Sequence, residues 1–177
     1  MKLLIMCEGS NELEIIKILL ENNCFTFTTN DLLGLVPYHA RQIDMSSAVK
    51  TALNLYSGND VIIYRIGDKQ SDKLRNPKEY RDQIKTVEKY CTLPELEVLL
   101  IIADGLYKDF RNIRPLNAKQ FAKSNIRFNG KRYDNSSKFY RDYFGCRPEL
   151  LVYCIKEYKK LNGSHNRDQL YLADLLK

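Results

Sequence analysis

Acidic side chains follow two apolar runs of the chain, and their type and spacing suit metal or acid–base chemistry. Glu8 comes directly after the run at 3–7, and Glu12 lies four residues further on. Asp68 follows a second apolar run at 61–66. Carboxylates bind Mg²⁺ in proteins and serve as general acids and bases. Two carboxylates ~4 Å apart repel by about 4 kcal/mol at an effective dielectric constant of ~20, so a cluster of them favours a bound cation.

The two apolar runs are typical of strands that are buried on both faces of a parallel sheet. After the first run, Gly9 permits a tight turn, Ser10 is a suitable N-cap, and an amphipathic helix follows. Open α/β sheets bind their ligands at the carboxyl ends of parallel strands. The sequence therefore predicts that Glu8 and Asp68 lie at one crevice, where Glu8 would act as a metal ligand or a general base.

The first stretch, EGSNE at residues 8–12 after a hydrophobic strand, resembles the E-G-x-x-E motif of the Toprim domain family. That family includes primases, topoisomerases, small ribonucleases and the OLD-type nucleases of phage defence. In it, the first Glu and a later acidic motif hold a divalent metal or act as general acid and base. The resemblance implies a Toprim-like α/β fold, Mg²⁺ or Mn²⁺ as cofactor, nuclease chemistry on DNA or RNA, and a role in phage defence.

The second acidic motif departs from the family pattern. Toprim domains carry D-x-D at a later strand end, whereas this chain has GDKQSD at residues 67–72. Asp68 matches the first acid, and Asp72 replaces the second only if the loop curls back. Lys69 or Arg65 would neutralise a phosphate. The missing second acid of the D-x-D motif supports an alternative, a degenerate Toprim-like module that binds nucleic acid or a protein partner without catalysis. A third hypothesis is an interaction protein whose acidic crevice has no chemical use.

A further acidic candidate is Glu97, within LPELEVLL at residues 93–100. This segment resembles the form N-P-x-F-E-x-W-L-L, which follows the acidic motif in nuclease-like Toprim proteins of abortive-infection and restriction loci. Together, the resemblance and the placement of these charged residues predict a set of catalytic residues, Glu8, Asp68 and Lys69, and a set of metal ligands, Glu8, Glu12, Asp68, Asp72 and Glu97. We also expect His39 and Arg41, which follow an apolar segment, to reach the same crevice.

Each acid also has an ordinary structural interpretation. Glu12 sits near the positive end of a helix, and Glu95 has the spacing of a capping-box partner. Asp68 is a typical turn residue or helix cap, and Asp72 suits a solvated loop. Glu97 fits an exposed position in the first turn of an apolar helix.

Composition limits the classes of protein to which the chain can belong. It has 177 residues and a net charge of +6, which favours polyanionic partners such as nucleic acid. Five cysteines without CxxC spacing favour a reducing cytoplasm over a disulfide scaffold, and Cys7 is expected to be buried in its strand. No apolar run approaches the ~18 residues that span a membrane, and the apolar start is too short for a signal peptide. His39 and His165 share no ligand spacing with a cysteine, which disfavours zinc.

We predict two parts, a Toprim-like α/β core at 1–112 with a mostly parallel sheet and flanking helices, and a helical C-terminal cap at 113–177 packed on it. Besides the two strands above, the core is expected to contain a strand at 24–29 and helices at 44–57, 77–90 and 92–110, with a short strand ending near Cys91 before the last helix. The cap is expected to contain a hairpin at 127–132 and helices at 117–124, 135–144, 148–161 and 167–176. The basic aromatic run 138–144 has the ingredients to stack bases, but helical periodicity favours rings that pack inward.

Overall fold

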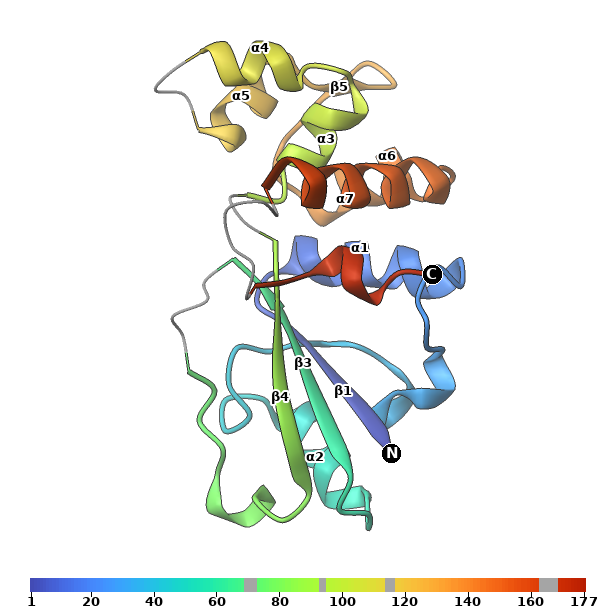
Figure 1. Ribbon diagram of the computed structural model, residues 1–177, viewed down its shortest axis with the longest axis vertical. Coiled ribbons are helices and arrows are strands. Elements are labelled where there is room, and N and C mark those ends of the chain that lie inside the picture. Colours follow the sequence, from blue (N-terminus) through green and yellow to red (C-terminus); the bar gives the residue numbers. More distant parts are fainter. Residues whose placement is uncertain (69–72, 93–94, 114–116, 163–168) are drawn as a thin grey trace.

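The computed structural model describes residues 1–68, 73–92, 95–113, 117–162 and 169–177. They form an α/β fold with a five-stranded parallel sheet of order β2-β1-β3-β4-β7, flanked by helices (Figure 1). Its strands are β1 (Lys2–Cys7), β2 (Tyr38–His39), β3 (Val61–Gly67), β4 (Ile84–Cys91) and β7 (Leu170–Tyr171). The predicted class is confirmed, since the architecture is consistent with a Toprim-like α/β fold and has a helical C-terminal region.

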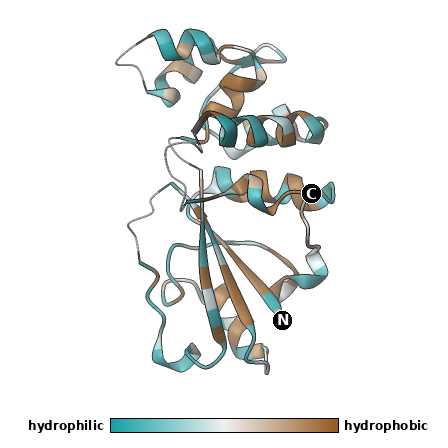
Figure 2. Ribbon diagram, in the orientation of Figure 1, coloured by the Kyte–Doolittle hydropathy of each residue, from teal (hydrophilic) through white to brown (hydrophobic). Residues whose placement is uncertain are grey.

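The central strands β1 and β3 separate two apolar cores. Successive side chains of a strand point to opposite faces, so Leu4 and Met6 enter one core while Leu3 and Ile5 enter the other. Helix α2 (Ser47–Leu55) covers the first core, and α1 (Ser10–Glu21) covers the second. Burial on both faces explains why the run 3–7 is continuously apolar and the run 61–66 is apolar except at Arg65, and Figure 2 shows both strands coloured mainly as hydrophobic.

The register of β1 and β3 sets where their carboxyl ends lie. The two strands pair in parallel from Lys2 opposite Val61 to Cys7 opposite Ile66. Their last residues are therefore level, and the residues that follow each strand start from the same edge of the sheet. This is the edge at which Glu8 and Asp68 were expected.

The C-terminal half adds a group of helices beyond α1. Figure 1 shows α1 lying between the sheet and these helices, and the larger core joins β1 and α1 to aromatic and aliphatic side chains from all of them. Residues on both sides of position 112 thus share one apolar core. The helices are α3 (Val98–Ala103), α4 (Tyr107–Asn112), α5 (Ala118–Asn125), α6 (Ser137–Phe144) and α7 (Pro148–Asn162), with the hairpin strands β5 (Arg127–Phe128) and β6 (Lys131–Arg132) between α5 and α6.

The segment 77–90, predicted as a polar helix, is instead the 3-10 helix η3 (Lys78–Tyr80) followed by β4. Its Lys and Glu residues favour a helix locally, but pairing within the sheet overrides that preference. β4 pairs with β3 along its length, and its last two residues pair with β7. The prediction was wrong because the polar side chains in the middle of the strand face solvent and give no apolar signal.

Two other predicted elements differ at the ends of the chain. The segment 167–176 is not an α-helix; its described part forms β7 and the 3-10 helix η4 (Leu172–Leu175). The predicted strand 24–29 makes only an isolated antiparallel bridge, from Phe25 to Leu176. Backbone hydrogen bonds tie the two segments to each other, which no local pattern in either segment could indicate.

The predicted helix 92–110 begins later and is divided. α3 starts at Val98, and Gly105, with φ +72°, separates it from α4. A left-handed residue ends a helix at little cost when it is glycine. Glu95 is consequently not a capping-box partner; its Oε2 accepts a hydrogen bond from the backbone N–H of Lys119 at 2.7 Å.

Several local predictions are confirmed. The predicted helix at 44–57 is α2, which Ser46 caps by accepting from the N–H of Val49, and the predicted hairpin at 127–132 turns through Asn129 and Gly130 at positive φ. α1 is present, although Gly9 and not Ser10 occupies its N-cap position. The aromatic residues of α6 pack inward as predicted, since Phe139, Tyr140, Tyr143 and Phe144 all lie in the core. Cys7 is fully buried, as was also predicted. No helix in the described ranges is both long enough and apolar enough to cross a bilayer.

Candidate functional site

Glu8 is held at the end of β1 by both its backbone and its side chain. Its N–H donates to the carbonyl of Ile66 at 2.9 Å, and its side chain is only 6% exposed. Oε1 of Glu8 lies 3.1 Å from Nη2 of Arg65, which is 2% exposed and also donates to the carbonyl of Arg41 at 3.3 Å. One carboxylate oxygen of Glu8 is therefore fixed in a buried ion pair.

Two glycines make room for the carboxylates. A Cβ atom added at Gly67 would overlap the carboxyl group of Glu8, and one added at Gly9 would overlap that of Glu12. Neither position has the positive φ that would by itself require glycine. At Gly67 the Glu8 side chain is held by Arg65, so space for that acid accounts for the glycine, whereas the end of the Glu12 side chain could turn away from a Cβ at position 9.

The pKa values show that the acids of the two strand ends affect one another. Burial raises the pKa of Glu8, the charges of Arg65 and Lys89 oppose the rise, and the charge and hydrogen bond of Asp68 add to it. Burial also raises the pKa of Glu12, while its own backbone hydrogen bond lowers it. The charges of three other carboxylates, those of Asp68, Glu97 and Glu8, raise it further. We call Glu8, Glu12, Asp68 and Glu97 the acidic edge.

Glu97 differs from the other three acids because the C-terminal half of the chain surrounds it. It is 7% exposed, and its Oε1 accepts from the hydroxyl of Tyr133 at 2.9 Å. That hydroxyl lies 3.1 Å from the hydroxyl of Tyr140. With its amide nitrogen towards the carboxylate, Asn135 lies 3.2 Å from Oε1 of Glu97, and its amide oxygen lies 3.0 Å from Nζ of Lys119.

These partners of Glu97 also respond to its charge. Burial is the main cause that raises the pKa of Tyr133, and the charge and hydrogen bond of Glu97 add to the rise. Burial likewise raises the pKa of Tyr140 well above its usual value, and the charges of Glu97 and Glu12 contribute. Both phenols therefore remain protonated, so that Tyr133 is a permanent donor to the Glu97 carboxylate.

A cleft opens beside Glu8 on the side of α2. Glu8, His39 and Arg41 line it together with the first turn of α2, including Ser46 and Ser47. Nε of Arg41 donates to the carbonyl of Glu8 at 3.4 Å. Two residues that can carry positive charge and a helix N-terminus thus face the buried acid. The prediction that His39 and Arg41 reach this region agrees with the geometry.

The structure brings together four of the five predicted metal ligands, which are the members of the acidic edge. The remaining ligand, Asp72, and the predicted catalytic Lys69 lie outside the described residues. Arg65, a predicted phosphate partner, is buried and paired with Glu8. Sequence reasoning missed Tyr133 and Asn135, because nothing in their local sequence indicates a contact with an acid 36 or more positions away.

The fit of this edge to a divalent cation is partial. Carboxylate oxygens are the donors that Mg²⁺ prefers. Among the described residues, however, no group of three or more His, Cys, Asp or Glu side chains is arranged to hold a metal ion. One oxygen of Glu8 faces Arg65 and one of Glu97 faces Tyr133, so a cation would be met mainly by the other oxygens and by Glu12 and Asp68.

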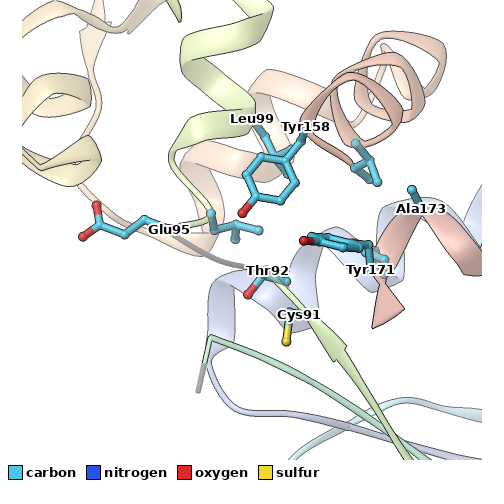
Figure 3. A pocket seen from close by; sticks show the side chains of 10 residues that line it. Cys91, Thr92, Glu95, Leu99, Tyr158, Tyr171 and Ala173 are labelled. Carbon is cyan, nitrogen blue, oxygen red and sulfur yellow. The ribbon is translucent and has the colours of Figure 1, made fainter. Parts of the chain in front are cut away.

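A separate pocket lies at the end of β4, between α3, α7 and η4 (Figure 3). The rings of Tyr158 and Tyr171 stand over Cys91 and Thr92, while the Glu95 carboxylate points away. Thr92 Oγ1 is buried without a hydrogen-bond partner among the described residues. The lining is otherwise mostly apolar and leaves room for little more than a water molecule.

Comparisons of the chain with protein-family models, with curated proteins and with solved structures found no match. The function is therefore inferred from the acidic edge and from the residues around it.

Proposed function

We propose that the protein carries out Mg²⁺-dependent, nuclease-like phosphodiester chemistry on DNA or RNA at the acidic edge, with Mn²⁺ as an alternative cofactor. The observation that carries the proposal is the convergence of four carboxylates from three chain segments at the carboxyl edge of a parallel sheet. The resemblance of residues 8–12 to the first Toprim motif supports it. A role in phage defence is proposed from that resemblance alone.

In the acidic edge, Glu8 and Glu97 are buried and hydrogen-bonded to other side chains, whereas Glu12 and Asp68 are more accessible. Glu12 is half-buried and Asp68 is exposed, so both can turn towards a cation, with the second oxygen of Glu8 and the carboxylate of Glu97 as further donors. A bound Mg²⁺ would polarise the phosphodiester and lower the pKa of a bound water. Burial raises the pKa of Glu8, which makes its carboxylate a stronger base and suits it to accept a proton from a bound water.

The cleft beside Glu8 supports a phosphate-bearing substrate. Arg41 and His39 are exposed there, and the first turn of α2 lines the same cleft. Guanidinium groups and helix N-termini are common phosphate partners in proteins. A phosphate held on that side of the cleft would lie next to Glu8.

A nuclease assay with Mg²⁺ or Mn²⁺ tests the proposal. We expect Glu8→Gln and Asp68→Asn to lower cleavage of DNA or RNA by at least ~10²-fold, in the range typical of lost general-base catalysis. Glu79→Gln is the matched control, since Glu79 is exposed on η3 at the opposite end of the sheet. Equal cleavage by the wild type, Glu8→Gln and Asp68→Asn would remove the assignment.

A second candidate is a degenerate Toprim-like module that binds nucleic acid or a protein partner without catalysis. The buried Glu8–Arg65 pair favours it, because the arginine supplies the counter-charge that a cation would otherwise supply. Titration calorimetry with Mg²⁺ distinguishes the two candidates. Binding at millimolar Mg²⁺ that Glu12→Gln weakens supports the enzyme, and no heat of binding supports the module.

A further inference from the structure

Most of the net positive charge of the chain lies in one short segment of its C-terminal half. Residues 117–138 contain six Lys or Arg residues and a single acid, Asp134, while the net charge of the whole chain is +6. All six basic side chains are exposed. We call five of them the basic strip: Lys119 and Lys123 on α5, and Arg127, Lys131 and Arg132 on the β5–β6 hairpin.

The basic strip brings like charges together. Arg127 and Arg132 are direct partners across the antiparallel hairpin, and Lys119 and Lys123 are four residues apart on α5. Like charges in either arrangement destabilise the element that carries them. In the described part of the chain, no ion pair with an acid offsets this repulsion at any of the five residues.

Other cations of the C-terminal half are neutralised. Arg141 pairs with two glutamates of α1, Lys159 pairs with Asp174, and Lys160 pairs with Glu157. The basic strip differs from these three cations because, within the described residues, none of its five members forms a salt bridge. An unneutralised row of Lys and Arg is the electrostatic footprint of a polyanion-binding surface.

The β5–β6 hairpin packs against α6 and Arg147 although it carries several positive charges. Phe128 packs against Tyr143 with ring centroids 5.1 Å apart, and the Arg147 guanidinium stands 4.7 Å over the Phe128 ring. The N–H of Tyr133 donates to the carbonyl of Ile126 at 3.1 Å and closes the base of the hairpin. A two-stranded hairpin alone is marginally stable, so this packing holds the charged side chains outward in a defined position.

The basic strip begins next to the acidic edge. Nζ of Lys119 lies 3.0 Å from the amide oxygen of Asn135, whose nitrogen faces Glu97. From there α5 carries Lys123, and the chain enters β5 directly after Ile126. β6 then leads back to Tyr133, which contacts Glu97. Asn135 and Tyr133 therefore connect the basic strip to Glu97 of the acidic edge.

We propose that the basic strip binds the phosphate backbone of the nucleic acid that the acidic edge acts on, with the hairpin as the outer contact and Lys119 as the inner one. The proposal deepens the proposed function and rests on its substrate being a nucleic acid, but it does not require cleavage. Arg side chains on a two-stranded ribbon match phosphate oxygens in bidentate geometry, and such a ribbon fits a nucleic-acid groove.

Binding is measured by fluorescence anisotropy in EDTA, which prevents cleavage, over a series of salt concentrations. The probes are a DNA duplex, single-stranded DNA and an RNA hairpin, so that the preferred form is identified in the same experiment. We expect the triple variant Arg127→Ala, Lys131→Ala, Arg132→Ala to reduce the slope of log K against log salt by about 2.7. Its affinity should fall on the order of 10²-fold at ~0.1 M salt.

The control is the triple variant Lys78→Ala, Arg81→Ala, Lys85→Ala, which removes the same charge from exposed residues at the amino end of β4. It should leave the salt slope unchanged. Equal losses in both triple variants would show an effect of net charge alone and would overturn the proposal. So would an absence of nucleic-acid binding by the wild type, or binding of anionic lipid vesicles in its place. Binding without cleavage would contradict only the proposed enzyme activity.

Discussion

The acidic edge and the basic strip carry opposite charge and are built in opposite ways. The edge collects acids from several segments of the chain, three of them buried or half-buried, and Glu8 and Glu97 have hydrogen-bond partners from other elements. The strip consists of exposed cations from one continuous segment. Changes in the edge should therefore alter stability and its pH dependence, whereas changes in the strip should alter binding with little loss of stability.

The largest effect is expected for Arg65→Met. It leaves the Glu8 carboxylate buried without its ion-pair partner. Breaking a buried pair in this way typically lowers the free energy of unfolding by about 3–5 kcal/mol. The loss should be smaller at acid pH, because the pKa of Glu8, already raised by burial, rises further and protonation removes the unpaired charge. Urea denaturation at several pH values measures both.

Arg75→Met is the control for Arg65→Met, because Arg75 forms an exposed pair with Asp44 at 3.6 Å. Exposed pairs contribute about 0–1 kcal/mol, so this variant should be nearly neutral. Similar losses in the two variants would contradict the buried character of the Glu8–Arg65 pair.

Tyr133→Phe should give the next largest effect. It removes the hydroxyl that donates to buried Glu97, and an unsatisfied buried acceptor costs about 1–3 kcal/mol. Tyr90→Phe is the comparison, since its hydroxyl donates at 2.7 Å to the half-buried Glu88, where water can replace it. Thermal unfolding should show a larger decrease in Tm for Tyr133→Phe, and the reverse order would argue against the role of Tyr133.

Glu12→Gln should stabilise the protein at neutral pH, on the order of 1 kcal/mol, as expected for a side chain that serves function at the expense of stability. The folded-state pKa of Glu12 is raised above its usual 4.5. Stability from this group is thus full below about 4.5 and is lost as pH rises through the raised value. The gain in the free energy of unfolding of Glu12→Gln should therefore appear as the pH rises above about 4.5 and vanish at lower pH, as urea denaturation at several pH values would show. A variant that is less stable than the wild type at pH 7 would contradict this prediction.

The smallest effect on stability is expected in the basic strip. Arg132→Glu replaces a like-charge pair with an opposite-charge pair across the hairpin, which should stabilise it by about 0.5 kcal/mol. The same change should weaken nucleic-acid binding. A loss of stability together with intact binding would remove the distinction between the two regions.

Much of the central architecture was predictable because its signals are local. Runs of apolar residues at 3–7 and 61–66 indicated two strands covered on both faces, and the acids that follow them were correctly expected at one edge. The Asn129–Gly130 turn was equally clear. Only the end of β4 was predicted, as a short strand ending near Cys91, because the exposed middle of β4 is polar and only pairing with its neighbours makes it a strand.

The sequence by itself determined the α/β class, the position of Glu8 and Asp68 at strand ends, and the charge of the hairpin segment. These depend on patterns within a few residues, where burial periodicity and turn preferences act. The tertiary structure alone decided that Arg65 pairs with Glu8 and that Tyr133 and Asn135 surround Glu97. The Arg65–Glu8 pair joins residues 57 positions apart and forms when β1 and β3 pair, whereas the Tyr133–Glu97 hydrogen bond joins residues 36 positions apart and needs the C-terminal half to pack against the core.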